Sequence, residues 1–98
     1  MTNDNNYQPQ IIWQGEPVGI FDSPQPDMWY LEGPWISNET DIAFLFKSAV
    51  EKLDLKSVYN TLEGVEAFLE FEGSDKQVRI IVIGLIEENI LFVRRMPS

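Results

Sequence analysis

The clearest pattern along the chain is an apolar stripe with helical spacing between positions 42 and 53. Its members are separated alternately by three positions and by one: Ile42, Leu45, Phe46, Ala49, Val50 and Leu53. This spacing places side chains on one face of an α-helix. Ser37 or Asn38 stands shortly before the stripe and is expected to accept a hydrogen bond from the first backbone N–H groups. The pattern predicts an amphipathic helix that ends near Asp54.

On both sides of this helix, the apolar residues alternate or run together as they do in β-strands. The predicted strands span residues 9–15, 18–21, 27–35, 65–72, 77–86 and 90–95. Residues 22–26 hold two prolines and are predicted to form a stiff loop. The spacing within 55–64 is compatible with a helical turn.

Short connections between these strands favour antiparallel neighbours. We therefore expect a single α+β domain over residues 9–98, preceded by a flexible polar tail at 1–8. Its antiparallel sheet is expected to be curved, with about six strands in the order β-β-β-α-β-β-β. One main amphipathic helix is expected to pack on one face of that sheet.

The segment 27–35 is the most distinctive in the chain. As a regular strand it would turn four residues toward the core: Trp29, Leu31, Gly33 and Trp35. Met28, Tyr30 and Glu32 would face outward. Phe21 and Phe68, on other strands, are also expected at outward positions or near the loop. Aromatic residues and methionine are enriched in protein interfaces. The predicted binding residues are therefore Asp27, Met28, Tyr30, Glu32 and Phe68, the alternative being that the tail or a second protomer covers them.

Composition argues against common catalytic chemistry. The chain has no histidine and no cysteine, so it lacks the usual general base and the commonest zinc ligands. Glu66, Glu70 and Glu72 line up on one strand instead of facing each other across a cleft, as paired catalytic acids would. We expect no catalytic residues, no metal and no cofactor, and hence a protein that is not an enzyme.

The formal net charge of −9 bears on partners and location. This charge repels nucleic-acid phosphates and anionic lipid, so neither is an expected partner. The longest apolar run is residues 80–86, whereas a membrane-spanning helix needs about 20 residues. The start of the sequence does not resemble a signal peptide, and the lack of cysteine favours a reducing compartment. A cytoplasmic location is expected.

The favoured function is a non-catalytic protein-binding module. Its most concrete form is a small acidic bacterial inhibitor or immunity-type protein that binds a basic partner, with negative charge speeding association. The alternative is a domain that binds a sugar or a cationic small molecule, or a minor hydrolytic domain, using the segment 27–35. A homodimer or larger homo-oligomer with a structural role is the third hypothesis.

Overall fold

The computed structural model describes residues 8–53, 64–71, 73, 76–87 and 89–96. The predicted tail lies outside the described residues except for Gln8, whose side-chain amide donates a hydrogen bond to Asp22 Oδ1 over 2.9 Å. The predicted helical turn within 55–64 also lies outside them, apart from Gly64.

The described elements comprise one helix and seven strands. In chain order they are β1 (Gln10–Trp13), β2 (Glu16–Phe21), β3 (Gln25–Asp27), β4 (Tyr30–Ser37), α1 (Asp41–Glu51), β5 (Val65–Glu70), β6 (Gln77–Ile86) and β7 (Ile90–Arg95). The order is therefore β-β-β-β-α-β-β-β. The predicted order lacked one strand before the helix.

The missing strand is β3, which arises where a stiff loop was predicted. Gln25 pairs with Glu32, and Asp27 pairs with Tyr30. Proline tolerates extended backbone and is compatible with an edge strand, where its missing N–H need not face a partner. The chain then reverses at Met28, which has a left-handed φ of 59°. The predicted strand 27–35 is thus a hairpin turn followed by β4.

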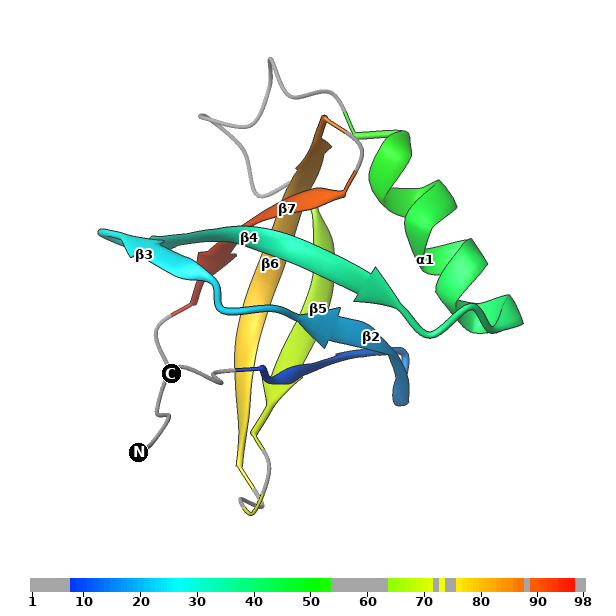
Figure 1. The fold of residues 1–98 in the computed structure, drawn as a ribbon, viewed down its shortest axis with the longest axis horizontal. Coiled ribbons are helices and arrows are strands. Elements are labelled where there is room, and N and C mark those ends of the chain that lie inside the picture. Colours follow the sequence, from blue (N-terminus) through cyan, green and yellow to red (C-terminus); the bar gives the residue numbers. More distant parts are fainter. Residues whose placement is uncertain (1–7, 54–63, 72, 74–75, 88, 97–98) are drawn as a thin grey trace.

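All the strand pairings are antiparallel, and they close on themselves. The sheet order is β2-β1-β5-β6-β7-β4-β3, and β2 pairs in addition with β4. Six strands therefore form a barrel, while β3 continues along the edge of β4 beyond β2 (Figure 1). The prediction of a small α+β unit with a helix and an antiparallel sheet agrees with this fold. The closure and the seventh strand were not predicted.

Helix α1 packs against the barrel through β2 and β6 (Figure 1). Its buried residues are Ala43, Phe46 and Val50. The ring of Phe46 lies between Trp13 and Trp35, with centroid distances of 5.6 and 5.4 Å. The predicted stripe is wrong at one position, because Leu45 is exposed and Ala43 takes the place facing the core.

Inside the barrel, alternate residues of the strands meet the helix in one apolar cluster. Its buried members are Ile11, Val18, Phe21, Leu31, Trp35, Ala43, Phe46, Val50, Ala67, Leu69, Ile80, Val82, Leu91 and Val93. The predicted inward positions Leu31 and Trp35 are confirmed. Phe21, which was expected at an outward position or near the loop, is instead buried, opposite Trp35 in the register of β2 and β4. No helix in the described part of the chain is long and apolar enough to cross a membrane.

The start of α1 is set by Thr40, and the predicted caps Ser37 and Asn38 are wrong. Thr40 Oγ1 accepts a hydrogen bond from the Ala43 N–H over 3.3 Å. Ser37 instead accepts from the Glu39 N–H, and the Asn38 side chain donates to the Pro17 carbonyl. Asn38 thus ties the loop before α1 to β2, while Ser37 closes a local turn, so the helix begins only after them.

We expect Thr40→Ala to lower the free energy of unfolding by about 1 kcal/mol, because an orphan N–H of the first helical turn loses its acceptor. Urea unfolding followed by circular dichroism measures this loss. Ser48→Ala, at an exposed position of the same helix, is the control and should leave stability unchanged or slightly raise it. Equal effects of the two substitutions would contradict the capping role.

Candidate functional site

Four of the five predicted binding residues gather at the hairpin between β3 and β4. Asp27 ends β3 and pairs with Tyr30, the first residue of β4. Met28 lies in the turn with 80% of its surface exposed. Glu32 is exposed two positions further along β4. We call Asp27, Met28, Trp29, Tyr30 and Glu32 the hairpin site.

Trp29 belongs to this site, although the sequence predicted it in the core. It is 56% exposed because it occupies the turn and not a strand position, so the in-and-out alternation begins only after it. Asp27 is a frequent turn residue, and it follows two prolines. That combination is the sequence feature that could have indicated a reversal at this point. Met28 and Trp29 together form an exposed apolar tip at the end of the hairpin.

The backbone of this tip is hydrogen-bonded to a residue of β7. The Arg95 N–H donates to the Trp29 carbonyl over 2.8 Å, and the Arg95 guanidinium donates to the Met28 carbonyl. Both turn carbonyls are therefore anchored by one residue. An apolar tip with a fixed backbone loses less conformational entropy when it binds.

Arg94 and Arg95 end β7 and do not lie beside the acidic residues of β5. In the sheet, β7 lies between β6 and β4, so β5 is not its neighbour. Glu66 of β5 instead forms an ion pair with Arg79 of β6. Arg95 is used at the hairpin, where it positions the turn.

Beside the tip, Tyr30 stacks on Phe92 of β7. Their ring centroids are 5.1 Å apart and the rings are nearly parallel, at 9°. Glu32 lies opposite Phe92 in the register of β4 and β7. Both rings are half-buried, so they form an aromatic platform on the outer barrel surface next to the exposed tip.

Phe68 is not part of the hairpin site. It lies on β5, half-buried and opposite Arg79 of β6. Two strands, β6 and β7, separate β5 from β4. At about 4.8 Å per strand, Phe68 is about 14 Å around the barrel from β4. The residue alternation predicted its outward orientation, but strand neighbours are set by pairings that alternation does not reveal.

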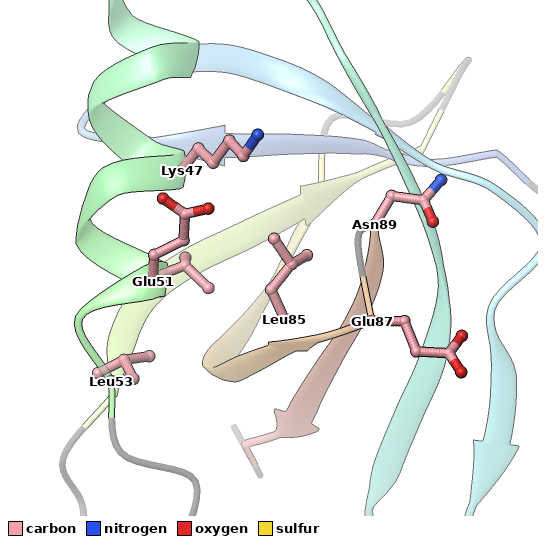
Figure 2. A pocket seen from close by; sticks show the side chains of 7 residues that line it. Lys47, Glu51, Leu53, Leu85, Glu87 and Asn89 are labelled. Atoms are coloured by element: carbon pink, nitrogen blue, oxygen red, sulfur yellow. The ribbon is translucent and has the colours of Figure 1, made fainter.

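A separate cleft of about 550 Å³ opens between the end of α1 and the turn joining β6 to β7 (Figure 2). Its lining residues are Lys47, Val50, Glu51, Leu53, Leu85, Glu87 and Asn89. Lys47 and Glu51 project from the helix, and Glu87 and Asn89 lie across from them (Figure 2). No residue of the hairpin site lines this cleft, nor does any tryptophan.

The side chains that line the cleft are poorly suited to bind a small ligand. Its four polar side chains are all exposed, whereas sites for small ligands usually hold a few buried polar groups that fix orientation. Among the residues the structure describes, no cluster of carboxylates is arranged to bind a metal ion. The hairpin site is therefore the better candidate for a functional surface.

Comparison of the chain with protein-family models, with curated proteins and with solved structures found no match.

Proposed function

We propose that this protein is a non-catalytic, cytoplasmic protein-binding module of the inhibitor or immunity type, and that it contacts a basic partner through the hairpin site. The observation that carries the proposal is the exposure of Met28 and Trp29 side by side on an anchored turn. Interfaces depend on a few large aromatic or methionine side chains that are held in place before binding.

The charge of the chain supports a basic partner. A net charge of −9 on 98 residues attracts a cationic protein over a distance of about 10 Å at ordinary salt. Glu32 adds an exposed carboxylate beside the tip. Long-range attraction mainly raises the association rate, while the apolar tip contributes to the lifetime of the complex.

The positions of the tryptophans favour protein contact over binding of a sugar or cationic ligand. That alternative requires a tryptophan in a concave pocket. Trp35 is buried in the core, and Trp29 lies on the hairpin that projects from the barrel (Figure 1).

The double variant Met28→Ser/Trp29→Ser is expected to bind its partner at least about 30-fold more weakly, because central apolar anchors contribute about 2 kcal/mol or more. Immobilised protein would be incubated with lysate of the source cells at low salt, and the captured proteins identified by mass spectrometry. The affinity of the identified partner would then be measured for each variant.

The matched control is Phe44→Ala/Leu45→Ala, which also removes two exposed apolar side chains but from α1. It should retain the partner. Raising salt from about 50 mM to about 500 mM should slow association much more than it speeds dissociation. Capture that is unchanged by the hairpin substitutions, or an acidic partner, would refute the proposal.

A further inference from the structure

Helix α1 has a second apolar surface, on the side opposite its buried stripe. Phe44 is 57% exposed and Leu45 is 59% exposed. Asp41 lies three positions before Phe44, and Ser48 lies three positions after Leu45. Residues three or four positions apart are neighbours on a helix, so all four share one exposed face. Lys52 extends the same face at the end of the helix. We call these five residues the outer face of α1.

The charges of this face are arranged for pairing with a copy of itself. The exposed Glu51 borders this face on the side of Phe44. Asp41 lies at the start of α1, and Lys52 directly follows the end. Among the described residues, neither forms an ion pair. When two such helices pack antiparallel about a two-fold axis, the acid of each meets the base of the other.

The same arrangement matches side-chain sizes. The two-fold axis that brings Asp41 opposite Lys52 passes near the middle of the helix, between positions 46 and 47. It places Leu45 of one copy opposite Ser48 of the second copy, so a large side chain meets a small one. Helices pack by inserting side chains of one into the spaces of the other.

From these observations we propose that the outer face of α1 is a self-association surface that binds a second copy of this chain. The helix has 11 residues, which at about 1.5 Å per residue is about 16 Å long. One helix pair of this length buries less than the roughly 1,600 Å² of a standard stable interface. The dimer is therefore weak and forms at high protein concentration. Helix α1 and the hairpin of β3 and β4 lie at opposite sides of the molecule (Figure 1). The proposed dimer does not depend on the function proposed for the hairpin site.

The test is sedimentation of the whole chain between about 20 µM and about 1 mM, a range that spans weak association. The wild-type chain should pass from monomer to dimer across it. Phe44→Ala/Leu45→Ala should weaken the dimer at least about tenfold while keeping the helix, because alanine favours helix. Met28→Ser/Trp29→Ser removes two exposed apolar residues from the other end of the molecule and should dimerise as the wild type does.

Charge substitutions test the antiparallel arrangement. Asp41→Lys alone and Lys52→Asp alone should each weaken the dimer about fivefold, since each creates two like-charged encounters. Asp41→Lys also makes the net charge less negative, so an effect of overall repulsion would instead strengthen association. The double exchange Asp41→Lys/Lys52→Asp should restore it.

Three results would overturn this proposal: a wild-type chain that stays monomeric at about 1 mM, loss of the dimer in the hairpin variant and not in the α1 variant, or failure of the double charge exchange to restore association. A failure of this kind leaves partner capture through the hairpin site unaffected. Conversely, a failure to capture a partner through the hairpin site would not change the dimerisation measured by sedimentation.

Discussion

Phe46→Ala should lower the free energy of unfolding by about 3–5 kcal/mol, as expected for a large buried aromatic side chain. Phe46 has no exposed surface, and its ring contacts the rings of Trp13 and Trp35. Removing it leaves a cavity between two rigid indoles that are themselves held by β1 and β4. Urea unfolding with tryptophan fluorescence would measure the change.

Phe44→Ala is the matched control for this prediction. It makes the same substitution two positions earlier on the same helix, where the side chain is mostly exposed. The expected loss is below about 1 kcal/mol, because little area is removed from a packed environment. Similar losses at the two positions would mean that α1 does not pack as described.

Gly19→Ala should lower the free energy of unfolding by about 3 kcal/mol. A Cβ at Gly19 would overlap the Trp35 indole nitrogen and the Ile36 carbonyl oxygen. The carbonyl belongs to the backbone of β4, which pairs with β2 at this point. Trp35 cannot move aside freely, because Phe46 packs against its ring. The substitution therefore strains the pairing that closes the barrel.

Gly15→Ala is the control, because it measures the cost of a side chain on an unusual backbone without any steric overlap. Gly15 has a left-handed φ of 82°, and a Cβ there would meet nothing within 4 Å. Its expected loss is about 1 kcal/mol, from backbone strain alone. Urea unfolding of both variants, with near-ultraviolet circular dichroism to follow Trp35, makes the comparison. A loss at Gly19 no greater than at Gly15 would rule out the predicted overlap.

Elements with strong local patterns could be predicted from the sequence. Helix α1 was recognised from its apolar spacing, and β7 was predicted at residues 90–95, where it lies. On β5, the outward position predicted for Phe68 agrees with the burial of its two neighbours, Ala67 and Leu69. Each of these predictions depends only on residues close together in the chain.

Two predictions failed because one pattern fits two structures. One concerns the rotation of α1 about its own axis, and the other concerns a chain reversal within an apparent strand. Leu45 and Ala43 lie on opposite flanks of α1, and hydrophobicity alone favoured the larger side chain as the buried one. Trp29 looked like a strand residue because it lies two positions before Leu31. The reversal at Met28 breaks this alternation.

The candidate site was predicted in part, because most of its residues are close together in the chain. Met28, Tyr30 and Glu32 are neighbours in sequence and remain neighbours at the hairpin. Phe68 was grouped with them only by its residue type and outward orientation. Its distance from the hairpin follows from β6 and β7 lying between β5 and β4, which is a property of pairings between distant segments.

The closed barrel has a consequence for how the chain folds. Two of its pairings, β1 with β5 and β4 with β7, join segments from opposite sides of α1 in the sequence. Hairpins such as β6–β7 form from neighbouring residues, but these two contacts require long loops to close first. Proteins rich in such contacts fold over milliseconds to seconds, far more slowly than helical bundles. The rate-limiting event in this chain should be the meeting of its two halves.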